Sequence, residues 1–229
     1  MMRLSISGSI PKLEVRGLKL RFADSGRELF GGLDFTLDSG ELLVISGGNA
    51  SGKSSLIHCL CGIIPKNIAG EADGEIFWGA KSLRDIPLAE VFRFMSVAPA
   101  DAKEQMLLPT VELEIAFALE NMGLDSGEIE RRISASASRF GLSDLLQAAP
   151  QKLSGGEQRL LLFAICDSMQ NPVLLMDEPE TGLSDASLDL LCAWLQELRE
   201  QGRAIILATH HPRLMQLADK QIKLELSDV

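Results

Sequence analysis

The chain has 229 residues, which is enough for one large domain or two small ones. Its 22 basic and 32 acidic residues give a formal net charge of −10, which argues against nucleic acid as a partner because nucleic-acid-binding domains normally present a basic surface. The hydrophobic share of 46% and the charged share of 24% are typical of a globular protein and exclude a disordered chain.

The N-terminal half is predicted to contain mainly strands. Residues 1–11 are expected to form a loose tail, and they lack the apolar core of a signal peptide. No stretch approaches the ~18 apolar residues that a membrane span needs. We therefore expect no direct insertion into a membrane. Strands are predicted at 13–22, 33–37, 41–46, 74–78 and 93–97, from alternating apolar and polar residues or, at 41–46, from an unbroken apolar run. A glycine pair predicts a turn at 27–32, and helical spacing of apolar residues predicts a helix at 54–64.

Helical signals dominate from residue 110 to residue 170, and strands and helices alternate again after that. Such alternation is typical of an α/β protein with a parallel sheet, so the helical stretch is predicted to be an insertion in that layer. The predicted helices lie at 111–122, 126–140, 144–149, 155–170, 185–201 and 211–219, and the predicted strands at 173–177, 203–209 and 220–226.

A glycine-rich loop follows the apolar strand at 41–46 and opens the next helix. It fits the pattern GxxxxGK[ST], in which backbone N–H groups face phosphates and the helix N-terminus adds partial positive charge. Lys53 is expected to reach the β- and γ-phosphates of a nucleotide, and the Ser54 hydroxyl to coordinate Mg²⁺. The predicted nucleotide-binding residues of this loop are Gly47, Gly48, Asn49, Ala50, Ser51, Gly52, Lys53, Ser54 and Ser55.

An acidic pair follows the apolar strand at 173–177. Asp177 ends that strand, where a carboxylate can hold Mg²⁺, so Ser54 and Asp177 are the predicted metal ligands. Glu178 is predicted to polarise the attacking water as a general base, an effect worth roughly 10²–10⁴ in rate. An isolated Asp-Glu pair is usually a solvated strand end, but the phosphate loop upstream favours the catalytic interpretation.

The segment LSGGE precedes a helix and lies between the phosphate loop and the acidic pair. In that position it resembles the signature of the ATP-binding cassette (ABC) ATPases, and the resemblance covers about residues 13–226. It implies an α/β P-loop fold of the ABC type with an antiparallel β subdomain and an inserted α-helical subdomain, and ATP and Mg²⁺ as cofactors. The implied organisation is a single domain over 1–229, with the ATP-binding core at 1–97 and 171–229 and the helical, signature-bearing subdomain at 98–170.

The resemblance also assigns roles to individual residues. Two cassettes of this family meet head to tail, so that each ATP lies between the phosphate loop of one chain and the signature of the other. Phe22 resembles the aromatic residue that stacks on adenine, although a core phenylalanine is the alternative. His210, rather than its neighbour His211, resembles the histidine that contacts the γ-phosphate and is counted as catalytic with Glu178. The implied signature residues are Leu153, Ser154, Gly155, Gly156 and Glu157.

Two positions depart from the family pattern. The family places a Gln that touches Mg²⁺ and the attacking water after the strand at 93–97, but here the equivalent position is Ala98, Pro99 or Ala100. The Asp expected after the acidic strand is replaced by Ser184. Both changes are predicted to weaken communication across a dimer rather than ATP binding, and they leave open a homodimer or a pair with a different cassette.

Segments 60–76 and 104–117 resemble the corresponding stretches of energy-coupling-factor and cobalt-type importer ATPases. This implies an ATP-hydrolysing motor subunit, peripheral at the cytoplasmic face of the cell membrane, that serves the uptake of a vitamin or a transition-metal ion. Its partner would be a transmembrane coupling subunit, with a helix docked in a groove near residues 100–110. The alternative is a soluble ABC ATPase with no role in transport, which the single cassette and the acidic charge disfavour.

Overall fold

The structure is a computed structural model that describes residues 12–21 and 28–225. It contains a four-stranded antiparallel sheet in the order β2-β1-β4-β5 and a five-stranded parallel sheet in the order β6-β7-β8-β3-β9. The strands are β1 (Leu13–Arg21), β2 (Glu28–Leu37), β3 (Leu42–Gly47), β4 (Glu71–Trp78), β5 (Lys81–Ser82), β6 (Met95–Ala98), β7 (Val173–Asp177), β8 (Ala204–Ala208) and β9 (Lys220–Leu224).

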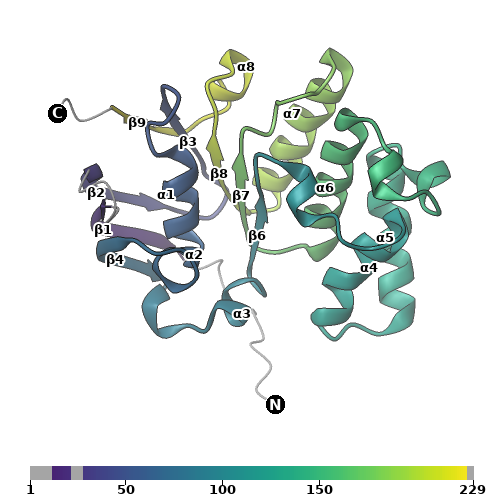
Figure 1. Cartoon of the computed structure of the whole chain (residues 1–229), viewed down its shortest axis with the longest axis horizontal. Coiled ribbons are helices and arrows are strands. Elements are labelled where there is room, and N and C mark those ends of the chain that lie inside the picture. Colours follow the sequence, from purple (N-terminus) through teal and green to yellow (C-terminus); the bar gives the residue numbers. More distant parts are fainter. Residues whose placement is uncertain (1–11, 22–27, 226–229) are drawn as a thin grey trace.

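The antiparallel sheet lies on one side of the parallel sheet, and helices α4 to α7 lie on the other (Figure 1). The α/β class predicted from the alternation of strands and helices is confirmed. None of the described helices is long and apolar enough to cross a membrane. The α-helices are α1 (Lys53–Leu60), α2 (Ile63–Lys66), α3 (Leu88–Val91), α4 (Val111–Asn121), α5 (Ser126–Arg139), α6 (Gly155–Met169), α7 (Asp185–Glu200) and α8 (Pro212–Met215); four short 3-10 helices lie at Leu83–Asp85, Ala102–Gln105, Ser143–Leu145 and Pro150–Lys152.

The parallel sheet is buried on both faces. Successive side chains of a strand point to opposite faces, and β3 divides accordingly. Leu42 and Val44 belong to the core beneath α4 to α7, whereas Leu43 and Ile45 belong to the core shared with α1 and the antiparallel sheet. All four are at most 1% exposed. Burial on both faces explains why this strand is an unbroken apolar run, as is usual in parallel sheets.

The turn predicted at 27–32 is wrong, because from residue 28 onward the chain lies in β2. Gly32 has a φ of +67°, and the pairing of β1 with β2 shifts register between Leu18 and Leu20. Glycine adopts positive φ without steric cost, and an irregularity of this kind bends a strand without ending it. The glycine pair therefore marks a bulged strand and not a reversal of the chain.

The helix predicted at 144–149 is also wrong. A 3-10 helix covers Ser143–Leu145, and the chain then turns. The carbonyls of Leu146 and Ala148 accept hydrogen bonds of 2.9 and 3.0 Å from the first two N–H groups of α4. A helix leaves its first N–H groups without internal partners, and here this segment satisfies them instead of continuing as a helix of its own.

Two further helices are shorter than predicted. The segment 54–64 divides at Gly62, where a φ of +76° ends α1 and begins α2. The segment 211–219 is helical only over α8, because Asp219 is already bonded to β3. Its N–H donates to the Leu42 carbonyl at 2.9 Å, and its carboxylate accepts from the Leu42 N–H at 2.8 Å.

An aromatic cluster joins α5, α6 and α7. Trp194, from α7, is 1% exposed, and its ring centroid lies 5.2 Å from that of Phe140 and 5.7 Å from that of Phe163. Its Nε1 donates to Asp167 Oδ1 on α6 at 2.9 Å. Such a side chain fills a large volume and donates to a half-buried carboxylate at the same time, so it should contribute strongly to stability.

We expect Trp194→Ala to lower the free energy of unfolding by about 3–5 kcal/mol, because it leaves a cavity among three helices. Trp194→Phe keeps much of the packing but removes the hydrogen bond to Asp167, so a smaller loss of about 1–3 kcal/mol is expected. Urea denaturation followed by circular dichroism measures both. Equal stability of Trp194→Ala and the parent would contradict this account of the core.

Candidate active site

Three strands of the parallel sheet end at one edge, and predicted site residues follow each of them. β3 ends at Gly47, β7 at Asp177 and β8 at Ala208. Ala208 is paired with Asp177 on one side and with Ile45 on the other, so the three strands end at nearly the same height in the sheet. The carboxyl ends of such strands form the usual ligand-binding edge of an open α/β sheet. The fold thus brings together the phosphate loop, the acidic pair and the segment that holds His210.

Close contacts explain the glycines of the phosphate loop. Gly47 has a φ of +154°, and a Cβ there would lie 2.5 Å from Ser51 Oγ and 2.6 Å from the Leu224 carbonyl oxygen. A Cβ on Gly48 would meet nothing within 4 Å, so that side of the loop is open. Gly52, with a φ of +94°, precedes the first residue of α1. The loop packs tightly against the protein on one side and leaves its backbone accessible on the other, as a phosphate cradle requires.

The buried side chain of Lys53 is hydrogen-bonded to the backbone of this loop. The residue is 6% exposed, and its Nζ donates to the carbonyls of Gly47 and Gly48 at 3.1 Å each. An ammonium group has three donors, so these two bonds leave one for an anion. Ser51 Oγ is buried and has no hydrogen-bond partner in the described part of the chain. The predicted lysine therefore lies at the start of α1 with its charge held against the loop.

Asp177 and Ser54 lie together and fit the predicted metal ligands. Asp177 is 5% exposed, and its Oδ1 has no hydrogen-bond partner among the described residues. Burial raises the pKa of its carboxyl, and a hydrogen bond from the Ser54 side chain opposes that shift. A buried carboxylate oxygen without a donor is costly unless a cation or a proton satisfies it. Carboxylate and hydroxyl oxygens are the hard ligands that Mg²⁺ prefers.

Glu178 has an uncommon backbone conformation. Its φ is +44°, in the left-handed region that few residues other than glycine adopt, and its N–H donates to the Ala208 carbonyl at 2.8 Å. Glu178 is the next residue after Asp177, and its side chain is half-buried. Conformations of this kind are strained and cluster at functional sites, so this one supports the choice of Glu178 as a reacting group.

A bridge between the ends of β7 and β8 was not predicted. The hydroxyl of Thr209, which is 0% exposed, donates to Glu180 Oε1 at 2.6 Å and accepts from the His211 N–H at 3.0 Å. Glu180 Oε2 and His211 Nδ1 are buried without partners in the described structure. The bridge fixes the segment that holds His210, whose side chain is exposed. No sequence signal singles out Glu180, because a second glutamate near an acidic pair is ordinary.

Arg159 is a second residue that the motifs missed. It lies on α6, is 3% exposed, and donates to the carbonyl of Pro99 at 2.7 Å and to that of Ala100. Burial lowers the pKa of this guanidinium, and nearby carboxylates, including those of Glu180 and Asp177, oppose the shift. The segment where the family has its Gln is therefore tied by its backbone to α6. The signal in the sequence is a charge inside an apolar helix.

The signature residues begin α6. Ser154 and Glu157 form a capping box, in which the Ser154 N–H donates to Glu157 Oε2 at 2.7 Å and the Glu157 N–H donates to Ser154 Oγ at 3.3 Å. The hydrogen bond from the Ser154 side chain lowers the pKa of the Glu157 carboxyl. A Cβ on Gly155 would meet nothing within 4 Å, whereas one on Gly156 would lie 3.2 Å from the Gly182 carbonyl oxygen. The helix start is open on the face of Gly155, as an anion site requires.

The other predicted residues are placed as follows. Leu153 is buried beneath the helix start, and Ser184 begins α7 as a cap, with its Oγ accepting from the Ser187 N–H at 3.2 Å. Serine and aspartate are equally good caps, so the replacement keeps this local function. Phe22 lies outside the described residues. Asn49 and Ala50 are exposed on the phosphate loop, and Ser55 is half-buried in the first turn of α1.

Comparison with known proteins agrees with these motifs. The sequence profile of the ABC transporter family matches residues 30–181. The chain is 32% identical over 213 residues to the energy-coupling factor transporter ATP-binding protein EcfA of Methanosphaera stadtmanae, covering 92% of this chain and 74% of that protein. It is 32% identical over 200 residues to the cobalt import ATP-binding protein CbiO of Syntrophus aciditrophicus, covering 87% and 70%.

Solved structures agree as well. The fold matches that of an ATP-binding subunit of an ABC transporter with a TM-score of 0.81 and 24% identity, over 95% of this chain and 87% of that one. It matches cbiO1 from Clostridium perfringens, described as part of the ABC transporter complex cbiONQ, with a TM-score of 0.79 and 25% identity, over 95% and 85%. The chain therefore belongs to the ABC transporter family, as an ATP-binding ATPase of the branch that contains the energy-coupling-factor and cobalt-import proteins.

Proposed function

We propose that the chain is the ATP-hydrolysing motor of an importer of the energy-coupling-factor type, which takes up a vitamin or a transition-metal ion. The observation that supports this most is the single sheet edge that holds the phosphate loop, Asp177, Glu178 and the His210 segment, in a chain of this branch. The motor would act at the cytoplasmic face of the membrane, as a peripheral subunit bound to a transmembrane coupling protein.

Binding of ATP with Mg²⁺ uses three side chains. The loop N–H groups and the Lys53 ammonium would bind the phosphates, and Ser54 and Asp177 would hold the metal. Bound Mg²⁺ supplies positive charge that neutralises the phosphates during transfer. The described residues include no cluster of three or more His, Cys, Asp or Glu suited to a metal, so the nucleotide and water would complete the ligand set. The buried Asp177 oxygen without a donor supports this assignment.

Glu178 accepts the proton of the attacking water, and His210 contacts the γ-phosphate. Both residues lie at the sheet edge where Asp177 ends β7 and would hold the metal. The backbone bond from Glu178 to Ala208 and the bridge from Thr209 to Glu180 join the two segments that hold these residues. This arrangement supplies orientation, which is a large part of catalysis in phosphoryl transfer.

We expect Glu178→Gln to keep ATP affinity and to lower turnover by about 10²-fold or more, because it removes the base without removing a phosphate contact. Lys53→Ala should instead weaken nucleotide binding. Fluorescent-nucleotide titration and phosphate release measure the two effects separately. Parental turnover in Glu178→Gln would contradict the assignment of the base.

The absence of Gln after β6 should lower the basal rate. Ala100 is exposed, so Ala100→Gln adds its side chain without disturbing the core. We expect this variant to hydrolyse ATP faster than the parent and to depend more steeply on Mg²⁺. Lys103→Gln, on an exposed neighbour, is the matched control and should leave the rate unchanged. An unaltered rate in Ala100→Gln would mean that the residue at 100 has no part in the reaction.

The signature at the start of α6 is proposed to complete the ATP site of a second cassette, head to tail. The open face of Gly155 and the capped start of the helix suit a γ-phosphate presented by another chain. The second cassette is either a copy of this chain or a different ATPase. Residues 98–170 would then form the subdomain that moves the signature toward the partner's nucleotide.

Exposed apolar side chains support a docking surface on this subdomain. Leu107, just before α4, is 82% exposed, and Leu113 and Phe117, on one face of α4, are 44% and 54% exposed. Grouped apolar side chains on a surface are typical of an interaction site. Pro99 and Ala100, which Arg159 ties to α6, precede Leu107 in the chain by only a few residues. A helix of the coupling protein docked there would act on both the signature helix and the sheet edge.

Leu107→Ser and Phe117→Ser should each reduce co-purification of an integral membrane subunit from solubilised membranes, while ATP affinity of the isolated chain stays parental. Ile68→Ser, which changes an apolar side chain that is 38% exposed elsewhere, is the control and should retain the complex. If no membrane subunit accompanies even the parental chain, the importer assignment fails and a soluble ABC ATPase is favoured.

A further inference from the structure

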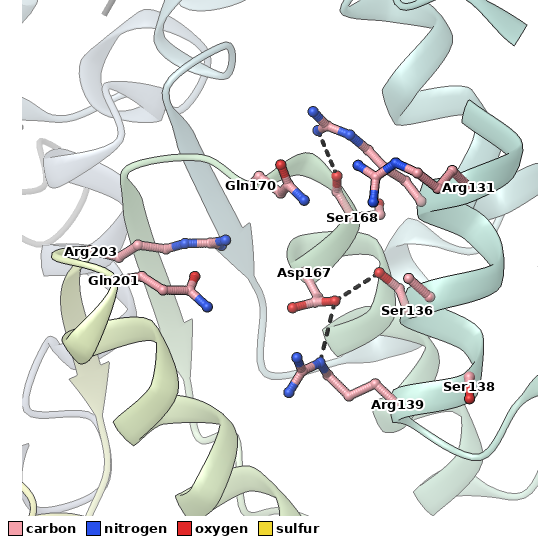
Figure 2. Close-up of a pocket in the computed structure, with 11 residues that line it drawn as sticks. Arg131, Ser136, Ser138, Arg139, Asp167, Ser168, Gln170, Gln201 and Arg203 are labelled. Carbon is pink, nitrogen blue, oxygen red and sulfur yellow. Dashed lines mark hydrogen bonds and ion pairs between the residues drawn. The ribbon is translucent and has the colours of Figure 1, made fainter. Parts of the chain in front are cut away.

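A cavity of about 630 Å³ lies at the edge of the parallel sheet opposite the phosphate loop. Gln170, just before β7, and Arg203, just before β8, line one part of it, and the amino ends of parallel strands lie opposite their carboxyl ends. Residues of α5 and of the C-terminal end of α6 form the rest (Figure 2). Small-molecule sites have volumes of about 300–1,000 Å³, so the cavity can hold a metabolite-sized ligand.

The cavity is basic, although the whole chain has a net charge of −10. Asp167 is the one acidic residue among those that line it, and both of its oxygens are already engaged. Its Oδ1 accepts from Trp194 Nε1 at 2.9 Å, and its Oδ2 accepts from Ser136 Oγ at 2.8 Å. The cationic residues of the lining are Arg131, Arg132, Arg139 and Arg203.

The arginines of α5 form hydrogen bonds with acidic residues and with the end of α6, which accounts for some of their N–H donors. Arg132 donates to Glu128 at 2.6 Å and to the Ser168 carbonyl at 3.0 Å, which caps the end of α6. Arg139 donates to Glu197 at 2.6 Å and forms an ion pair with Asp167 Oδ2 at 3.7 Å. Each guanidinium has five N–H donors, so these contacts leave donors over. Neither Glu128 nor Glu197 is among the residues that line the cavity.

Arg203 is different, because none of the side-chain hydrogen bonds or ion pairs within the described residues involves its guanidinium. Burial lowers its pKa, Asp167 opposes this, and the neighbouring charges of Arg139 and Arg132 lower it further. Figure 2 shows the side chains of Arg203 and Gln201 pointing toward Asp167 across the opening. Asp167 is the one carboxylate of the lining that offsets this repulsion, and it also pairs with Arg139, so a bound anion would neutralise the remaining positive charge.

We propose that this cavity is a binding site for a small anion with two or more phosphate or carboxylate groups. Arg203 binds one group from the side of the sheet, and the arginines of α5 bind another from the opposite wall. The planar fork of a guanidinium matches the oxygens of both kinds of group. Gln170 and Gln201 add amide donors. The site is separate from the ATP site and touches the C-terminal end of the helix whose start is the signature.

The test is calorimetric titration of the full chain with inorganic pyrophosphate and, separately, with citrate. The protein is first saturated with ADP, so that the phosphate loop is filled. We expect saturable binding, weakened at least about tenfold by Arg203→Gln, because a charge-assisted contact is lost. Gln201→Glu, which places a negative charge on an exposed turn, should weaken it similarly while melting at the parental temperature.

Arg93→Gln removes an exposed arginine elsewhere and should bind both probes as the parent does. Binding of pyrophosphate alone would assign phosphate groups to the ligand, and binding of both probes would assign polyanions in general. The proposal is overturned if neither probe binds saturably, or if both cavity variants bind as tightly as the parent. The second result would place the binding outside this cavity.

Discussion

The parallel pairing of β3 with β8 and β9 is the constraint on which the site depends. The end of β9 brings the Leu224 carbonyl so close to Gly47 that no side chain fits there, and β8 places Ala208 level with Asp177. The first contact makes the loop turn sharply into α1, so that its backbone stays open for phosphate. The second puts the acidic pair beside that loop. A shift of one residue in either pairing would separate the lysine from the carboxylates and abolish the site.

Helix α6 connects this edge with distant parts of the molecule. Its first turn is the signature, capped by Ser154 and Glu157, and its second turn holds Arg159, which binds the segment after β6. Its last turn is capped by Arg132 and hydrogen-bonded to the aromatic cluster through Asp167. A rigid helix with contacts at its start, middle and end can transmit a displacement at one of them to the others. Through these contacts α6 connects the signature, the segment after β6 and the lining of the basic cavity.

Much of the fold and of the site could be predicted from the sequence, because the features concerned are local. The apolar run of β3, the glycines that follow it and the acid at the end of β7 are each dictated by neighbours within a few residues. The wrong turn at 27–32 and the wrong helix at 144–149 have a different cause. β2 continues through its glycines because β1 pairs with it, and Leu146 and Ala148 give their carbonyls to α4. Such long-range partners have no local signature.

The roles of Glu180 and Arg159 could not be predicted either, because their hydrogen-bond partners lie 29 and 60 residues away in the chain. The contacts of Arg159 also bear on the absence of the family's Gln at residue 100. Its guanidinium binds main-chain carbonyls, so the position of this segment relative to α6 is independent of the side chain at residue 100. The chain therefore keeps the contact between this segment and α6 although it lacks Gln there. The side chain that the family uses to contact Mg²⁺ and the attacking water is absent all the same, so weaker communication across a dimer stays a prediction.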